Sequence, residues 1–389
     1  MFAAATHWLS TKRIEWRARS IRDPIQRLKY LRQGNTGRPA GGLWGHWRSR
    51  CLSAVLLGGI LLAPGYTGSA VHETLSDLRG SAQPALNTTA ADRVPDVWLV
   101  EEKTGYEVFS NGLRLETRFT TAGDRRSYPA FPLQGAVDKP ELRRQPVGIV
   151  YHTTESHIAP FDRGHNARMR YVGRWLLEYI HNQQAYHFLI DRFGRVHRIV
   201  EETGAANHAG ASVWADRHHA YVNLNHSFLG VAFEAQTQAG APSDISAPQI
   251  HAARMLTEML RSKYVIAAAN CVTHAQVSVA ESLSRLGNHL DWAGHFPFEE
   301  IGLPDNYGLA APGVYVFGLT YNTDLVNVTG PRFWKGLLLG DDQLRQDAAA
   351  QRMHPAQYRA ALQERYRKMM AALPRDPAGE SRPSQESEE

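Results

Sequence analysis

The chain has 389 residues, of which 43% are hydrophobic, and this length and composition indicate a globular protein with a full core and no more than that. Residues 1–50 carry eleven Lys or Arg against Glu15 and Asp23, a charge of +9, so the overall +5 leaves −4 on the other 339 residues. The folded part is therefore not basic. A nucleic-acid-binding role is excluded for it and left only to the basic leader, residues 1–50, and we expect no nucleic-acid partner.

An uncharged apolar run, residues 52–66, follows Arg48 and Arg50 directly. A membrane-spanning helix needs about 20 apolar residues, so this run is short for a span and has the proportions of a signal-peptide core. Small residues suited to cleavage follow at 68–70. The alternative is an uncleaved anchor with its N-terminus inside, which would attach the protein to a membrane through residues 51–70. Both interpretations predict that the chain after residue 71 is exported to the periplasm or cell envelope.

The only cysteines are Cys51, at the front of the apolar run, and Cys271. An exported domain with one thiol must be held together by its core and not by disulfides. Residues 71–94 are polar, contain Pro84, and are predicted to be a linker.

A small β-rich preface is predicted at residues 95–146. Asn111-Gly112 lies between two partly alternating runs within 106–117, which is the strongest short signal for a hairpin. A continuously apolar run at 147–152 then predicts a central strand that is buried on both faces.

The next elements alternate between strand and helix. Helical spacing of apolar residues predicts a helix at 166–182, a turn around Gly194 joins two strands in a hairpin at 185–200, and another strand is predicted at 228–233. Ser246 and Gln249 form a capping box for a helix at 247–264. This order predicts an α/β fold with a mixed central β-sheet covered by helices.

The signals weaken after residue 302. Within a C-terminal extension at 303–373 we expect a strand at 313–320 and a helix over 342–373, and the Pro- and Glu-rich residues 374–389 are predicted to be a disordered tail.

Three side chains in this pattern have the chemistry of a catalytic metal site. His152 ends the central strand, where α/β sheets open onto their ligand crevice, and His274 follows the short apolar run after the last helix. Asp291 comes later in the chain. Two imidazoles and one carboxylate leave a fourth position for water, which is typical of catalytic zinc, whereas structural zinc has four closed ligands.

Five blocks of the sequence, in this order, resemble the N-acetylmuramoyl-L-alanine amidase type 2 family, which shares its fold with the peptidoglycan recognition proteins. They are Gly148–Thr154, Ala185–Gly194, Asn207–Ser212, Leu229–Glu234 and Thr273–His274. The resemblance covers about residues 147–300, so we assign residues 147–302 to a zinc amidase domain.

The resemblance implies a zinc ion on His152, His274 and Asp291 and hydrolysis of the amide bond between N-acetylmuramic acid and L-alanine in peptidoglycan or muropeptides. It implies that Tyr186 positions the attacking water or supports the transition state. His208 falls where the family lines its substrate groove. We place Thr153 and Trp214 in the same groove, although Trp214 is equally suited to the core.

The sequence departs from the family at three points. The recycling branch has a catalytic glutamate where this chain has Ala232, and the chain instead keeps Tyr186, as the tyrosine-using branch does. The family's Lys or Arg before the third ligand is replaced by His289, which we expect to take part in catalysis. The segment from His274 to Asp291 is longer than usual, so His289 and His295 remain competing candidates for the third ligand.

A proton must also reach the leaving amine, and His289, Glu155 and Glu234 are the candidates for its donor. An alternative function is a non-catalytic peptidoglycan-binding module of the same fold. The presence of both Asp291 and Tyr186 favours the enzyme, which we expect to be a monomer.

Overall fold

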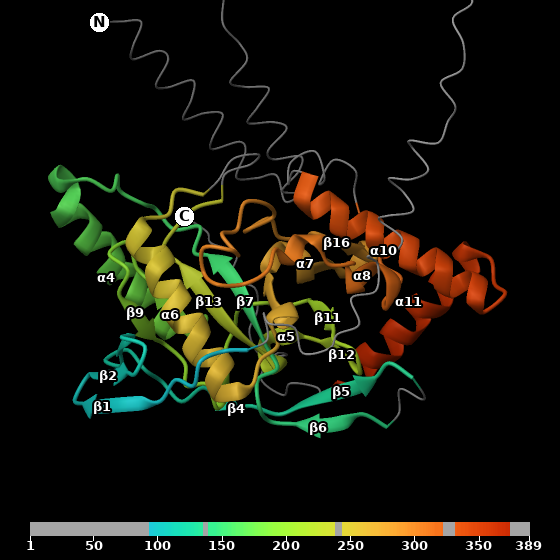
Figure 1. Ribbon diagram of the computed structural model, residues 1–389, viewed down its shortest axis with the longest axis horizontal. Helices are drawn as coiled ribbons and strands as arrows, with labels where there is room; N and C mark the ends of the chain where they lie inside the picture. Colours follow the sequence, from blue (N-terminus) through green and yellow to red (C-terminus); the bar gives the residue numbers. More distant parts are fainter. Residues whose placement is uncertain (1–92, 135–138, 238–242, 322–330, 374–389) are drawn as a thin grey trace, which may run out of the picture. The chain divides into compact units, whose positions relative to one another are not determined.

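An eight-stranded mixed sheet forms the centre of the part of the chain that the structure describes (Figure 1). The computed structural model describes residues 93–134, 139–237, 243–321 and 331–373, of which 331–334 are described only as backbone. The predicted leader (1–50), the signal peptide or anchor (51–70), nearly all of the linker (71–94) and the tail (374–389) lie outside these residues. In the described residues, no helix is long and apolar enough to cross a membrane.

The strands of the sheet come from residues 99–273. Its order is β1 (Leu99–Lys103), β2 (Tyr106–Phe109), β3 (Arg114–Glu116), β9 (Val196–Arg198), β8 (Phe188–Ile190), β13 (Phe228–Phe233), β7 (Gly148–Thr153) and β14 (Cys271–Thr273). Strands β8, β13, β7 and β14 pair in parallel, as do β3 and β9, and the other pairs are antiparallel. The predicted mixed sheet is confirmed. The first three strands of the predicted preface belong to this sheet.

The central strands are buried because helix α6 (Ala247–Tyr264) covers one face, while helix α4 (Asn166–Asn182) and residues of a smaller sheet, such as Tyr128 and Tyr221, cover the other. Every residue of β7 and β13 is buried. Helix α6 lies across its face of the sheet, where Leu256 and Leu260 share a cluster with Tyr151 (Figure 1). Helix α4 packs through Leu177 against Ala232 of β13. Since side chains alternate along a strand, His152 points away from the face that Tyr151 shares with α6.

Smaller elements surround the sheet. A four-stranded sheet has the order β11 (Val213–Ala215), β12 (His219–Val222), β5 (Tyr128–Pro132) and β6 (Glu141–Arg143). Two short pairs are β4 (Asp124–Arg125) with β10 (Gly204–Ala205) and β15 (Val279–Ala280) with β16 (Arg285–Leu286). The remaining short helices before the extension are η2 (Arg163–His165), α5 (Leu224–Ser227), η3 (Ala268–Asn270), α7 (His274–Val277) and η4 (Glu281–Leu283).

Most sequence-predicted elements are confirmed. The Asn111-Gly112 hairpin forms between β2 and β3, the 185–200 hairpin forms between β8 and β9, and the strands at β7 and β13 appear as expected. The helices at 166–182 and 247–264 have the predicted bounds, and the Ser246–Gln249 capping box is present.

Two predictions in the extension are wrong. Residues 313–320 are not a strand: Pro312 begins the short helix α8 (Pro312–Tyr315), and Gly318 at φ +69° turns the chain. The single helix expected over 342–373 is two, α10 (Pro331–Ala350) and α11 (Pro355–Ala371). Pro355 cannot continue a helix from the preceding turn, and His354 caps the new one through Ala356 N–H. The extension also contains η5 (Asn306–Gly308).

Candidate metal centre

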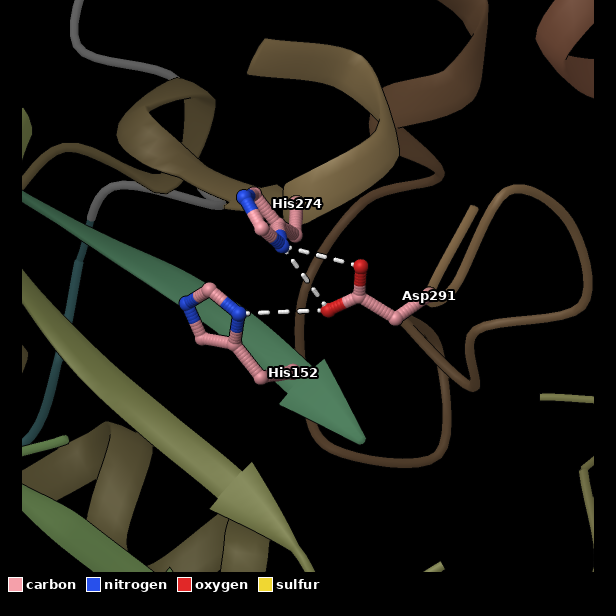
Figure 2. Close-up of side chains that lie close together, drawn as sticks. All are labelled: His152, His274 and Asp291. Carbon is pink, nitrogen blue, oxygen red and sulfur yellow. Dashed lines mark hydrogen bonds and ion pairs between the residues drawn. The ribbon is translucent and has the colours of Figure 1, made fainter. Parts of the chain in front are cut away.

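Two of the three predicted ligands are placed by the register of the sheet. His152 is near the end of β7, and His274 directly follows β14, which pairs with β7 in parallel so that Thr273 lies opposite Tyr151. The carboxyl ends of parallel strands meet at one edge of a sheet, where ligands bind. Asp291 approaches from a loop after β16 (Figure 2).

The three side chains converge. His152 Nδ1 lies 3.2 Å from Asp291 Oδ2, and His274 Nδ1 lies 2.9 Å from Oδ1 and 3.1 Å from Oδ2 of the same carboxylate (Figure 2). All three residues are buried, and each offers a ligand atom within 4.8 Å of the others. The sequence therefore identified a real cluster from residues 139 positions apart in the chain.

The protonation states suit a metal site. Burial, and then the neighbouring His274, lowers the pKa of His152 to about 4, although Asp291 raises it. Burial raises the pKa of Asp291, but the attraction of His274 and His152 outweighs burial and keeps that pKa below its usual range. At neutral pH the cluster therefore presents a neutral imidazole and an ionised carboxylate, which are the forms that bind a cation.

The residues fit a zinc ion by chemistry and by spacing. Neutral imidazole and carboxylate are the donors of three-ligand catalytic zinc sites. Zinc binds such donors at about 2.0–2.1 Å, so two ligands of a tetrahedral site lie about 3.3–3.4 Å apart. The N···O separations of 2.9 to 3.2 Å in this cluster are close to that distance between two ligands. His152, His274 and Asp291 are therefore the residues that would hold the metal.

The competing third ligands lie elsewhere. The ring of His289 stacks on that of His274, with centroids 4.5 Å apart and planes 16° apart, and His295 is exposed. Neither belongs to the His152 group of potential ligands. Burial, followed by His274, lowers the pKa of His289, so its imidazole is neutral at pH 7.

Tyr186 lies beside the cluster. Its ring centroid is 5.1 Å from that of His152. Burial, and then the charge of Asp291, raises the pKa of Tyr186, so the hydroxyl keeps its proton and can donate a hydrogen bond. Tyr186 also has a left-handed backbone at φ +62°, which is costly for a bulky residue, and strained residues of this kind cluster at functional sites.

The residues predicted to line the substrate groove are placed differently. Trp214 is 3% exposed and its indole N–H donates to Asn270 Oδ1 at 3.1 Å, so it packs in the core and has no face free to stack on a sugar. Thr153 is buried on the strand face opposite to His152, and its hydroxyl donates to Glu155 Oε1 at 2.5 Å. Both side chains are buried and not exposed in a groove as predicted. The local sequence could not show this, because a tryptophan or a threonine is compatible with either position.

His208 lies against the cluster and contacts His152 directly. Its Nδ1 is 3.1 Å from His152 Nε2, and its Nε2 is 3.3 Å from the Phe228 carbonyl oxygen. Burial, and then the proximity of His152, lowers the pKa of His208, so its ring is neutral.

The two candidate glutamates have other partners. Glu155 is exposed and its carboxylate accepts from Thr153 and from Thr237 N–H at 2.8 Å. Glu234 is buried after β13, accepts from Arg192 N–H at 3.1 Å, and has its pKa raised to about 7 by burial.

Sequence reasoning missed Tyr307, in the extension. Its hydroxyl donates to the Trp292 carbonyl at 2.6 Å and accepts from Phe296 N–H at 3.2 Å, so it holds the loop that carries Asp291. No local motif marks a tyrosine for this contact.

Comparisons with known proteins agree with the sequence blocks. Residues 142–291 match the family described as N-acetylmuramoyl-L-alanine amidase. The match ends at the third candidate ligand. No curated protein matches the chain.

Several solved structures are similar to parts of the chain. The N-acetylmuramoyl-L-alanine amidase LysC from Clostridium intestinale URNW is 22% identical over 40% of this chain and 83% of its own, with a TM-score of 0.27. AmiD from E. coli, in complex with anhydro-N-acetylmuramic acid-L-Ala-D-gamma-Glu-L-Lys, is 22% identical over 51% of this chain and 65% of its own (TM-score 0.30). Drosophila peptidoglycan recognition protein SD is 17% identical over 43% and 85% (TM-score 0.28).

Proposed function

We propose that this protein is a zinc-dependent hydrolase that cleaves the amide bond between N-acetylmuramic acid and L-alanine in peptidoglycan or muropeptides. The observation that carries the proposal is the convergence of His152, His274 and Asp291 on one point, in the segment that matches the amidase family. Two imidazoles with one carboxylate make a three-donor set that leaves a position for water.

The residues around the metal position divide the chemistry between them. A zinc ion held there would polarise the substrate carbonyl and make a water nucleophile available near neutral pH. Tyr186 keeps its hydroxyl proton and lies beside His152, so we assign it to the developing oxyanion as a hydrogen-bond donor. The recycling branch of the family has a catalytic glutamate at the position of Ala232. With a metal to activate the water and Tyr186 to bind the oxyanion, this chain does not need that base.

Proton transfer to the leaving amine is assigned to His289. Its ring stacks on His274, which brings it next to the cluster, and it is neutral at pH 7, so it can take up a proton and pass it on. Glu155 is exposed and already accepts two hydrogen bonds, and Glu234 is turned toward Arg192 N–H. These contacts favour the histidine over either glutamate.

The proposal includes export. The apolar run after the basic leader supports a cleaved signal peptide or a membrane anchor, and both would bring the domain to the peptidoglycan. N-terminal sequencing of the protein recovered from the cell envelope distinguishes them: a start near residue 71 supports cleavage, and an intact leader in the membrane fraction supports the anchor. Recovery of the intact chain in the cytoplasm alone would contradict export.

The activity is tested with purified muropeptides and the full chain, with and without a chelator, followed by mass spectrometry. We expect free peptide and free muramyl sugar without chelator only, and their return when zinc is added back. Y186F should slow cleavage by about 10²–10³-fold, the cost of losing an oxyanion donor, while zinc binding stays unchanged. Binding of muropeptides without any cleavage at saturating zinc would overturn the hydrolase and support a binding module.

A further inference from the structure

The backbone fixes which groups donate and which accept in the half-buried hydrogen-bond chain that runs from Phe228 through His208 to His152. His208 Nε2 faces the Phe228 carbonyl oxygen at 3.3 Å, and a carbonyl can only accept. The proton of the neutral His208 ring therefore lies on Nε2. Its Nδ1 is left as an acceptor, 3.1 Å from His152 Nε2, so His152 must be the donor in that contact.

This polarity determines what His152 presents to Asp291. With its proton on Nε2, the His152 ring directs the lone pair of Nδ1 at Asp291 Oδ2, 3.2 Å away. Two electron pairs that face each other at this distance repel, and a cation between them removes the repulsion. A hydrogen bond from Nδ1 to the carboxylate would instead need the opposite tautomer, which the Phe228 carbonyl disfavours through His208.

The position of His208 is itself rigid. Asn225 Oδ1 accepts from three consecutive backbone N–H groups, those of His208, Ala209 and Gly210, at 3.0, 2.7 and 3.2 Å. On the other side the ring lies over Gly230, where a Cβ would stand 2.6 Å from His208 Cγ. A residue larger than glycine at 230 would displace the imidazole, so loop and strand together hold it.

We propose that His208 is a positioning residue for the metal: it fixes His152 in the tautomer whose Nδ1 lone pair faces the ion. This rests on the proposed zinc site and deepens it. His208 is thereby assigned to the metal and not to the substrate groove. The second ligand has no such support, since His274 Nε2 is buried without a hydrogen-bond partner among the described residues. Metal-ligating histidines generally donate their other nitrogen to an acceptor, and loss of that acceptor costs about 10–100-fold in metal affinity.

Two amide substitutions at His208 test whether an acceptor facing His152 is needed or whether any polar side chain at this position is enough. In H208N the amide oxygen can occupy the place of Nδ1 and accept from His152. In H208Q the amide reaches the place of Nε2 and can donate to the Phe228 carbonyl, but no acceptor faces His152. We expect zinc affinity, measured by competition with a chromogenic chelator, to fall about 10–100-fold in H208Q and less than about fivefold in H208N.

The Co²⁺-substituted protein gives a second readout, because its absorption bands report the ligand set. They should shift in H208Q and stay close to wild type in H208N. H197Q is the matched control: His197 is buried on β9 and contacts Asp191 and not the cluster, so its loss should leave zinc affinity unchanged. Melting temperatures in excess chelator check that all variants fold.

The outcomes are distinguishable. If wild type binds zinc and H208N and H208Q bind it equally, whether both like wild type or both weakly, the assignment of His208 is overturned while the zinc site stands. If wild type itself binds no zinc, the proposed function falls first, and this inference falls with it.

Discussion

The two histidines and the aspartate of the cluster are positioned in different ways. His152 and His274 follow adjacent parallel strands, whose pairing from Cys271↔Ile149 to Thr273↔Tyr151 fixes where each strand ends. Asp291 lies in a loop whose backbone is left-handed at Trp292 (φ +55°) and His295 (φ +61°). Such conformations are costly for residues other than glycine and persist only where neighbours enforce them. The sheet thus places two candidate ligands, and the position of the third depends on contacts around its loop.

Some of those contacts come from the sheet and from α7, since Phe233 packs on Trp292 and Ala275 N–H donates to the Asp291 carbonyl, and others come from the extension. Tyr307 of the extension makes two hydrogen bonds to the loop. The side chain of Gln276 donates to the carbonyl of the neighbouring residue Asn306 at 3.0 Å, and helix α10 packs closely on Tyr307 at Gly336. A Cβ at Gly336 would stand 2.6 Å from the Tyr307 carbonyl oxygen, so glycine permits the approach. The extension therefore acts as a brace for the loop that carries Asp291, although the family match ends at residue 291.

Removal of the loop ligand should have the largest effect. D291A leaves two imidazoles and no negative charge to balance the ion. We expect zinc affinity to fall by more than about a hundredfold, which exceeds the effect of losing a residue that only positions a ligand. Amide cleavage should disappear at ordinary zinc concentrations. Isothermal titration with zinc and the muropeptide assay measure both. D342A, on an exposed part of α10, is the control and should change neither. Unchanged zinc binding in D291A would remove the loop from the metal site altogether.

Loosening the loop without touching a ligand should have an intermediate effect. Y307F keeps the buried ring but loses the hydroxyl that holds the Trp292 carbonyl and Phe296 N–H. We expect zinc to dissociate about tenfold faster, and the free energy of unfolding to fall by about 1–3 kcal/mol, the cost of leaving buried polar groups unpaired. Stopped-flow transfer of zinc to a chelator measures the rate.

Y366F is a matched control for that variant. Tyr366 is also a buried tyrosine of the extension, but its hydroxyl has no hydrogen-bond partner among the described residues. Its loss should leave the zinc dissociation rate unchanged. Equal rates in Y307F, Y366F and wild type would show that the brace does not reach the metal.

The same contrast explains how much the sequence could predict. The apolar run of β7, the helix spacing of α6 and its capping box are local patterns, and they led to the sheet and to the two strand-end ligands. Asp291 lies in a loop without periodicity, so the residues alone offered it only as a carboxylate suited to the set, and the family resemblance implied its role as third ligand. The burial of Trp214 and the contact of Tyr307 with Trp292 depend on residues 56 and 15 positions away, which no local pattern encodes. The expected strand at 313–320 failed because an apolar run alone does not separate a strand from a buried short helix.

The strands that position the histidines also bury a carboxyl group, that of Glu234, which lowers stability at neutral pH. This effect should appear in the pH dependence of the free energy of unfolding and not in metal binding. Glu234 follows β13 and is 2% exposed, and burial raises its pKa to about 7 from an ordinary value of 4.5. The folded state therefore binds this proton more tightly than the unfolded state does, so the free energy of unfolding is highest below pH 4.5, falls as pH rises to about 7, and is level above. The full span corresponds to about 3 kcal/mol.

E234Q keeps an acceptor for Arg192 N–H without the charge. It should therefore be more stable than wild type at pH 8 by about 1–3 kcal/mol and nearly equal to it at pH 4.5, with the same zinc affinity. Urea unfolding of both proteins from pH 4.5 to 8 gives the difference, and a difference that does not change with pH would mean that Glu234 is not desolvated at the end of its strand.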